Sequence, residues 1–242
     1  MFSLEGKTIL ITGAAQRIGR SLALSVGRAG GDVVIHYGRS LAEAESAQAE
    51  VQALGRKAYL LQADLNDPEQ ASGLIQRALE LTTLDGLVNN ASIFEPLSWK
   101  ETSLETWNKH LSVNLTAPFL LSQAFAKTLP KGKEGRIVNL LDWRALRPGA
   151  DHLPYTISKA ALAALTYSLA AALAPQITVN GLALGAILPP SDGGASNKII
   201  ESVPAGRWAR LEEVGQALLF LLAGPMYTTG EIIHVDGGRH LV

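Results

Sequence analysis

Short apolar runs alternate with longer segments rich in Ala, Leu or Glu along all 242 residues of the chain. Continuous apolar runs of this kind are typical of strands that are buried on both faces, as in a parallel sheet. The intervening segments have the length and composition of helices. The alternation therefore predicts βα units and a single α/β domain that spans residues 1–242. The expected strands are residues 7–12, 32–37, 57–62, 84–89, 136–141, 176–181 and 231–235.

Local signals predict where the helices begin and bend. Residues 40–43 (SLAE) and 102–105 (TSLE) have the Ser/Thr-x-x-Glu pattern of capping boxes. Asp67, which precedes a proline, predicts a capped helix start. Pro118 predicts a kink near Asn114, because proline cannot donate a backbone hydrogen bond. The expected helices are residues 21–29, 40–54, 68–81, 102–129, 154–174 and 211–222.

The composition is that of a compact globule, with 47% hydrophobic and 18% charged residues. A net charge of −1 without a basic block gives no footprint for nucleic acid or an anionic membrane. The absence of cysteine excludes disulfides and thiolate metal sites, and the five histidines lack metal-ligand spacing. No leader-like N-terminus and no uncharged apolar run of ~20 residues occurs. We therefore expect a cytoplasmic protein with a small-molecule substrate, no metal, and no nucleic-acid or membrane partner.

A glycine-containing turn follows the first expected strand and leads into the first helix. Its sequence is TGAAQRIGR, with Gly13 and Gly19 on either side of Arg17 and Ile18. Such a turn lets backbone N–H groups and the positive end of a helix dipole face a pyrophosphate. Arg17 stands where these loops usually carry another glycine. In a strand–turn–helix context the motif favours a dinucleotide cofactor over a turn without a ligand.

The residues after the second expected strand predict the type of nicotinamide cofactor. An acidic residue usually holds the NAD ribose here, but the sequence has His36, Tyr37, Arg39 and Ser40 in this region. The Arg39 guanidinium and the Ser40 hydroxyl suit a 2′-phosphate, which a carboxylate would repel. NADPH is therefore expected rather than NADH.

Two other segments are expected to border a ligand. Asp64 and Leu65 follow the third strand, where Asp64 either accepts from an adenine amino group or forms an Asx turn, and the sequence favours neither. Residues 188–210 are rich in Gly, Pro and Ser, which predicts a mobile flap, and the substrate flap as a whole spans about 184–210. Candidates for the pocket wall, or equally for core packing, are Trp143, His152, Leu188 and Trp208.

Three titratable residues point to reductive chemistry. Tyr155 and Lys159 are four residues apart in a helical segment, so the phenol and the ammonium share one helix face. A neighbouring ammonium favours the phenolate, so we expect a lowered pKa for Tyr155. Asp142 ends the fifth strand, where partial desolvation is expected to keep it protonated. Two proton donors beside a cation predict a reductase site, although a surface pair and a turn-capping aspartate give the same local pattern.

Taken together, these motifs resemble those of the short-chain dehydrogenase/reductase family over essentially the whole chain. The matching elements are the loop at 12–19, the NNAS sequence at 89–92, Asn114, and the pair Tyr155 and Lys159. The resemblance implies a doubly wound, seven-stranded parallel sheet with helices on both faces (a Rossmann fold). It also implies that Tyr155 donates a proton, that Lys159 binds the nicotinamide ribose, and that Asn114 holds a water of the proton relay.

The same resemblance assigns further residues to the cofactor. Asn89, Asn90 and Ala91 would line its ribose. Backbone groups at Gly185 and Ile187, after the sixth strand, would meet the nicotinamide carboxamide. The proline that the family commonly has before this glycine is absent, which leaves the geometry of the flap open.

Two departures narrow the resemblance. Asp142 replaces the serine that the family usually has thirteen residues before Tyr155, and Arg17 replaces a glycine. With Ser92 and Phe94, these changes resemble the pteridine reductase branch, and the C-terminal DGGRHL sequence resembles that of dihydromonapterin reductases. A pterin would then stack between Phe94 and the nicotinamide, with Arg17 at its carbonyl edge. Ser92, which also borders the cofactor, would bond the pterin amino group, and Asp142 and Tyr155 would protonate a ring nitrogen.

The leading hypothesis is an NADPH-dependent reductase of a pterin or dihydropterin. The alternative is a carbonyl reductase of the same family, such as a 3-oxoacyl-[acyl-carrier-protein] reductase, and a third is a non-catalytic NADPH-sensing protein. The resemblance also implies a homotetramer. The apolar helical segments 104–129 and 154–174 agree with burial between subunits.

Overall fold

The computed structural model describes residues 2–189 and 196–242. Seven strands in this part of the chain form one parallel sheet in the order β3-β2-β1-β4-β5-β6-β7. This order, with a crossover back to the centre after β3, is the doubly wound sheet that was predicted. The strands are β1 (Thr8–Ile11), β2 (Asp32–Tyr37), β3 (Ala58–Gln62), β4 (Gly86–Asn89), β5 (Gly135–Asp142), β6 (Ile177–Leu184) and β7 (Ile232–Val235).

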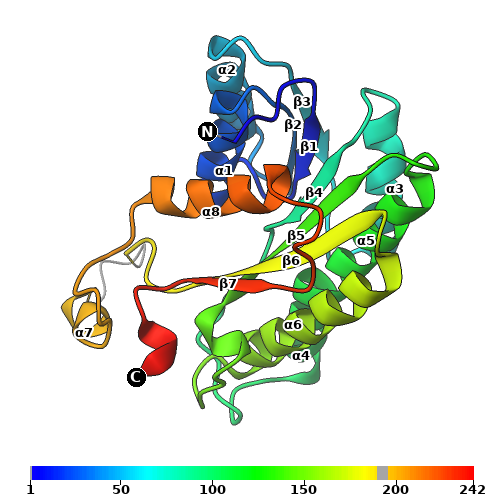
Figure 1. Ribbon diagram of the computed structural model, residues 1–242. Helices are drawn as coiled ribbons and strands as arrows, with labels where there is room; N and C mark the ends of the chain where they lie inside the picture. Colours follow the sequence, from blue (N-terminus) through cyan, green and yellow to red (C-terminus); the bar gives the residue numbers. More distant parts are fainter. Residues whose placement is uncertain (1, 190–195) are drawn as a thin grey trace.

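Helices cover both faces of the sheet (Figure 1), as expected. α1, α2 and α8 pack over one buried apolar cluster, and α3 and α5 pack over another on the opposite face. The helices are α1 (Arg17–Arg28), α2 (Leu41–Ala53), α3 (Pro68–Leu79), α4 (Leu104–Leu111), α5 (Ala117–Thr128), α6 (Leu153–Leu173), α7 (Ser196–Glu201) and α8 (Leu211–Ala223). Three short turns complete the elements: η1 (Ser112–Thr116), η2 (Trp143–Ala145) and η3 (Arg239–Leu241).

The helix starts agree only in part with the sequence signals. Asp67 caps α3 as predicted, because its carboxylate accepts from the first backbone N–H groups of the helix. The two predicted capping boxes are wrong. Ser40 makes no cap bond and instead accepts from the amide of Gln16 at 2.8 Å. α4 is capped by Ser103, one residue after the predicted Thr102, because its hydroxyl reaches the backbone N–H of Thr106.

The predicted kink near Asn114 is present as the π-helical turn η1, which joins α4 to α5. Pro118 has no N–H to donate to the carbonyl of Asn114, four residues earlier, so the regular α-helical pattern breaks at that point. The extra residue of the π turn directs Asn114 into the protein, where it is fully buried.

β5 and β6 are longer than predicted and set the position of the site. Asp142 pairs in register with Leu184, so both strands end at the same level of the sheet. α6 lies beside them and packs Leu162 and Ala163 against Leu141 in a third apolar cluster. By length and a mean hydropathy of 1.3, α6 alone among the described residues could span a membrane. Part of its apolar surface packs against the sheet, and 39% of the apolar window is buried.

Candidate active site

A cavity of about 530 Å³ lies at the carboxyl end of the sheet, where doubly wound folds bind their ligands. Residues at the ends of β5 and β6 and at the start of α6 line it. Four of the five residues predicted to bind substrate are in its wall: Arg17, Phe94, Asp142 and Tyr155. All four candidates for the pocket wall are there as well: Trp143, His152, Leu188 and Trp208. The two residues that depart from the family pattern, Arg17 and Asp142, therefore border one space.

A smaller recess of about 200 Å³ continues this cavity toward the loop before α1. Arg17, Asp142, Tyr155 and Gly185 line both spaces. The other walls of the recess include five residues predicted to bind the cofactor or border it: Ile18, Asn90, Ser92, Lys159 and Ile187. The predicted cofactor residues and the predicted catalytic residues thus meet in one continuous site.

Asp142 has a different partner for each of its carboxylate oxygens. Oδ2 accepts from the Tyr155 hydroxyl at 3.1 Å. Oδ1 accepts from the backbone N–H of Arg144 at 2.9 Å, which caps η2, and lies 3.5 Å from the Arg144 guanidinium. Donors thus face both carboxyl oxygens of Asp142. The expectation that Asp142 is protonated stays a prediction.

The pKa of Tyr155 is raised well above its ordinary value, so the predicted lowering is wrong. Burial is the main cause, the charge of Asp142 and the hydrogen bond to it add to the effect, and Arg144 opposes it. The ammonium of Lys159 lies 5.8 Å from the centroid of the tyrosine ring and is directed at the Leu140 carbonyl. The phenol therefore keeps its proton, as a proton donor requires.

Lys159 is buried beneath this pair. Its ammonium donates to the Leu140 carbonyl at 2.7 Å, and burial lowers its pKa to about 8, partly offset by the charge of Asp142. An ammonium has three donors, and the described residues accept from one of them. The other two suit the hydroxyls of a ribose, in agreement with the predicted role of Lys159.

Asn114 fixes the segment that borders the recess. Its Oδ1 accepts from the backbone N–H of Ile93 at 2.9 Å and from the Ser92 hydroxyl at 3.1 Å. Its Nδ2 donates to the Ile93 carbonyl and to the Ser158 hydroxyl, both at 3.0 Å. Asn114 thus positions Ser92, a role that the sequence does not reveal. Its part in holding a water stays a prediction.

The loop before α1 has the tight geometry expected for a pyrophosphate site. Gly13 has a φ of +62°, and a Cβ on Gly19 would clash with the Gly13 carbonyl. Arg17 also has a positive φ, of 51°, in a region that residues with a side chain rarely adopt. That conformation costs about 1–3 kcal/mol, which a glycine would avoid. The strain points to a function for the Arg17 side chain.

His36 holds this loop from beneath. Its Nδ1 accepts from the backbone N–H of Gly13 at 3.0 Å, and its Nε2 lies 3.1 Å from the Ala63 carbonyl. Burial lowers the pKa of His36 to about 4, so the ring is neutral with its proton on Nε2. Both nitrogens are bonded and only 2% of the residue is exposed, so a direct contact of His36 with the cofactor stays a prediction. His36 positions the loop through its hydrogen bond with the backbone of Gly13.

The segment after β4 docks on the same loop. The amide of Asn90 donates to the Thr12 carbonyl at 2.8 Å, and the backbone N–H of Ala91 donates to the Thr12 hydroxyl at 3.0 Å. Asn89 is buried and donates to Asn139 of β5 at 2.8 Å. Asn89 is therefore part of the sheet interior and does not line a ribose, whereas Asn90 borders the recess.

The residues predicted at the adenosine end lie at the edge of β2 and β3. Tyr37 is half-buried and Arg39 is exposed. In the described residues no carboxylate pairs with Arg39, which leaves it available to a 2′-phosphate. Asp64 forms the Asx turn that was one of its two alternatives, since its Oδ1 accepts from the backbone N–H of Asn66 at 2.9 Å. Leu65 is buried, and an adenine contact at this segment stays a prediction.

Phe94 forms an aromatic wall at the cavity. It stacks on His152 with ring centroids 4.0 Å apart and meets the Tyr155 ring edge-on at 4.6 Å. His152 is itself anchored by a hydrogen bond of 3.0 Å to the Glu95 carbonyl. Phe94 remains 52% exposed, so a flat ligand has ring surface to contact beside the proton-donating phenol.

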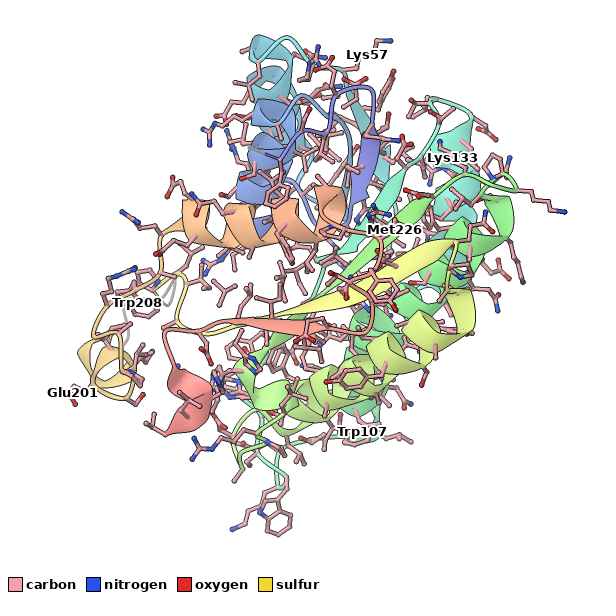
Figure 2. The ribbon with its side chains drawn as sticks, in the orientation of Figure 1. Lys57, Trp107, Lys133, Glu201, Trp208 and Met226 are labelled. Atoms are coloured by element: carbon pink, nitrogen blue, oxygen red, sulfur yellow. The ribbon has the colours of Figure 1, made fainter. Side chains whose placement is uncertain are left out.

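The described part of the predicted flap reaches over the cavity. Leu188, Ile199 and Trp208 line it, and Figure 2 shows Trp208 on the segment between α7 and α8. The backbone N–H of Ala209 donates to the Ala186 carbonyl at 3.0 Å, which closes the segment back onto the end of β6. Residues 190–195 of the predicted flap lie outside the described residues. The mobility of the flap stays a prediction.

Two arginines that the sequence reasoning did not assign also line the cavity, Arg144 and Arg239. Arg144 could have been recognised as a counter-ion two residues after Asp142. Arg239 belongs to the C-terminal DGGRHL sequence, and only the fold brings it to Trp143, 4.5 Å from the indole ring. No cluster of His, Asp and Glu suited to a metal occurs among the described residues.

The chain belongs to the short-chain dehydrogenase/reductase family. A family model described as enoyl-(acyl carrier protein) reductase matches residues 13–240. The sheet order and the glycine loop agree with this assignment, as do Tyr155 and Lys159 in one recess and the bond of Asn114 to Ser158 between them in sequence.

Within the family, the chain is similar to proteins with several activities. It is 32% identical to the 3-oxoacyl-[acyl-carrier-protein] reductase of Synechocystis sp., covering 98% of both chains. It is 34% identical to the 2-dehydro-3-deoxy-D-gluconate 5-dehydrogenase of Bacillus subtilis, covering 98% of this chain and 96% of that one. Among solved structures, FolM alternative dihydrofolate reductase 1 of Brucella canis, in complex with NADP, has a TM-score of 0.91 and 34% identity. That alignment covers 99% of this chain and 96% of the other.

Proposed function

We propose that this protein is an NADPH-dependent reductase that reduces a C=N bond of a pterin or dihydropterin. One observation carries the proposal: Arg17 and Asp142 line the same cavity as Tyr155. A guanidinium only donates hydrogen bonds and a carboxylate only accepts them. Together they suit a ring that carries both a carbonyl and N–H groups. A ketone oxygen has only lone pairs to offer and gains nothing from Asp142.

The described residues fit NADPH. The positive φ of Gly13 and the N-terminus of α1 make a pyrophosphate cradle, and Arg39 without a nearby carboxylate suits a 2′-phosphate. The spare donors of Lys159 suit the nicotinamide ribose. When bound, NADPH would supply the hydride that adds to the ring carbon. The NADP-bound structure of the Brucella canis relative supports this choice.

Tyr155 supplies the proton that the ring nitrogen needs once hydride has added to carbon. Its raised pKa keeps the phenol protonated before the reaction. The hydrogen bond from Tyr155 to Asp142 fixes the direction of the hydroxyl. The buried ammonium of Lys159 is the nearby cation that stabilises the phenolate left after transfer. Hydride at carbon and proton at nitrogen together convert C=N into CH–NH.

The second candidate is a carbonyl reductase, such as a 3-oxoacyl-[acyl-carrier-protein] reductase. The name of the Synechocystis relative favours it, whereas Asp142 in the cavity argues against it. A non-catalytic NADPH sensor is the least supported of the three, because Asn114, Tyr155 and Lys159 are all in position.

Steady-state turnover with NADPH tests the proposal. The protein should reduce 7,8-dihydropterins at least tenfold more efficiently in kcat/KM than acetoacetyl thioesters. Comparable or faster reduction of the thioester would contradict it and favour the carbonyl reductase. Failure to reduce either, with tight NADPH binding retained, would favour the sensor.

We also propose that the protein is a homotetramer, as the family resemblance implies. The outer faces of α5 and α6 expose the apolar side chains of Phe119, Ile157 and Tyr167. Such side chains on neighbouring helices suit burial against a second copy. Light scattering after size-exclusion chromatography should give four times the chain mass of 25.7 kDa. A monomer would contradict the proposal.

A further inference from the structure

A second cavity adjoins the first at the outer end of the site. It is also about 530 Å³, and the two share Trp143 and Arg239. Its remaining wall comes from Glu201 at the end of α7, from the turn that follows, and from Val242, near η3. The indole and the guanidinium therefore stand at the passage between an inner chamber, which contains Asp142 and Tyr155, and an outer chamber beneath α7. A ligand that fills both chambers must have two parts, a head and a tail.

Three guanidinium groups face the inner chamber, and among the described residues only that of Arg144 has carboxylate partners. Arg144 pairs with Asp151 at 2.8 Å and lies 3.5 Å from Asp142. Arg17 lies on the loop that the proposed function assigns to the cofactor pyrophosphate and to the carbonyl edge of the head. Arg239, like Arg17, forms no ion pair with a carboxylate of residues 2–189 and 196–242, but it lines both chambers and does not lie on the cofactor loop.

The carboxylate nearest to Arg239 in sequence is already occupied. Asp236 is buried and accepts from the backbone N–H groups of Gly238 and His240 and from the His240 ring. Arg239 is instead held against Trp143, 4.5 Å from the ring, while Arg144 lies 4.8 Å from the same ring. Burial and the charge of Arg144 lower the pKa of Arg239. Two guanidinium groups thus share one indole at the passage, and of the two only that of Arg144 has a carboxylate partner among the described residues.

We propose that Arg239, braced by Trp143, is an anion subsite that binds the acidic tail of a two-part substrate whose flat head lies in the inner chamber. The proposal rests on the proposed function for the identity of the head. The tail is a carboxylate of the kind that a pterin with an acidic side chain carries. A half-buried guanidinium forms strong, charge-assisted hydrogen bonds with a carboxylate, whereas a neutral polyol tail gains little from it.

One carboxylate of the outer chamber, that of Glu201, would repel the acidic tail. Glu201 is exposed at the end of α7, toward the outer edge of the molecule in Figure 2. An exposed charge is screened by solvent and salt more than a half-buried one. The attraction of Arg239 for the tail should therefore outweigh the repulsion from Glu201. Removal of Glu201 should strengthen binding of the acidic tail, whereas removal of Arg239 should weaken it. A general loss of folding would weaken binding in both variants.

Calorimetric titration of the NADP⁺-loaded protein tests the subsite without requiring turnover. Folic acid and biopterin share the pterin head, but the first has an acidic tail and the second a neutral one. R239Q should weaken folic acid binding about tenfold, or about 1.4 kcal/mol, and leave biopterin binding unchanged. R239K should recover part of the loss. E201Q should tighten folic acid binding about twofold. R147Q, at an exposed arginine outside both cavities, is the matched control and should change neither ligand.

The outcomes separate this inference from the proposed function. Equal weakening of both ligands by R239Q, no weakening, or no binding of folic acid overturns the anion subsite. If R239Q discriminates between the tails but the enzyme reduces no dihydropterin, the subsite stands and the proposed function falls. If the enzyme reduces dihydropterins with acidic and neutral tails and R239Q changes neither KM, the function stands and the subsite falls.

Discussion

The Tyr155 hydroxyl donates to Oδ2 of Asp142 over 3.1 Å, which joins the start of α6 to the end of β5. The carboxylate orients the phenol and raises its pKa. The pair therefore favours a substrate that can donate a hydrogen bond to the carboxylate while accepting a proton from the phenol. A ring with an N–H beside a C=N meets both conditions.

Replacement of Asp142 should change the substrate preference. D142S restores a hydroxyl in place of the carboxylate, and kcat/KM for a dihydropterin should fall about a hundredfold, of the order seen on loss of a charged hydrogen-bond partner. Reduction of an acetoacetyl thioester should be unchanged or faster. D142N keeps the shape of the side chain but not its charge, and should also impair dihydropterin reduction. Equal losses on both substrates would show that Asp142 does not select the substrate.

Removal of the Tyr155 hydroxyl should abolish most of the turnover. Y155F retains the aromatic contact with Phe94 but has no proton to transfer. General acid catalysis contributes about 10²–10⁴-fold, so kcat should fall by this factor. NADPH affinity, measured by quenching of protein fluorescence, should stay within about twofold of the wild type. A small loss of kcat would mean that another group, such as Asp142 with a water, delivers the proton.

The sequence predicts the fold well because each βα unit carries its own local signal. The strand positions, the helix kink at Pro118 and the cap at Asp67 follow from apolar runs and from backbone chemistry within a few residues. The order of the strands agrees with the family resemblance, which local patterns alone do not supply. The capping boxes fail for a tertiary reason. The Ser40 hydroxyl accepts from Gln16, which lies 24 positions earlier in the chain. A pattern of four neighbouring residues carries no information about this competing partner.

The site residues are predictable in identity but less so in their electrostatics. Arg17, Asp142 and Tyr155 meet as expected, yet the pKa of Tyr155 moves in the opposite direction. The helical spacing of Tyr155 and Lys159 is correct, but burial and the Asp142 charge outweigh the ammonium. Arg239 contributes to the cavity because η3 folds against Trp143, a contact over 96 residues of sequence that no motif encodes.

The preference for NADPH should depend on Arg39. R39A removes the exposed guanidinium that the proposed 2′-phosphate contact uses, and the ratio of kcat/KM for NADPH to that for NADH should fall about tenfold or more. The loss should come from KM for NADPH. R28A, at the far end of α1, is a matched removal of an arginine and should leave the ratio unchanged. An unaltered ratio in R39A would place the 2′-phosphate elsewhere.

The stability of the protein should carry a pH dependence from His36. Its pKa is about 4 in the folded protein because of burial, against an ordinary value of 6.5. Between these values the unfolded chain binds a proton that the folded chain does not, so the free energy of unfolding decreases as the pH falls. The contribution is complete above pH 6.5 and is lost as the pH approaches 4. A difference of 2.5 pH units corresponds to about 3 kcal/mol.

The variant H36N isolates the contribution of His36 to the pH dependence of stability. The asparagine oxygen takes the position of Nδ1 and still accepts from the Gly13 N–H, but it does not titrate. Urea unfolding at pH 7.5 and at pH 4.5 should show that the wild type loses about 2.5 kcal/mol more than H36N. All other titrating groups cancel in this comparison, since the two proteins share them. Parallel losses in both proteins would contradict a neutral His36 in the folded state.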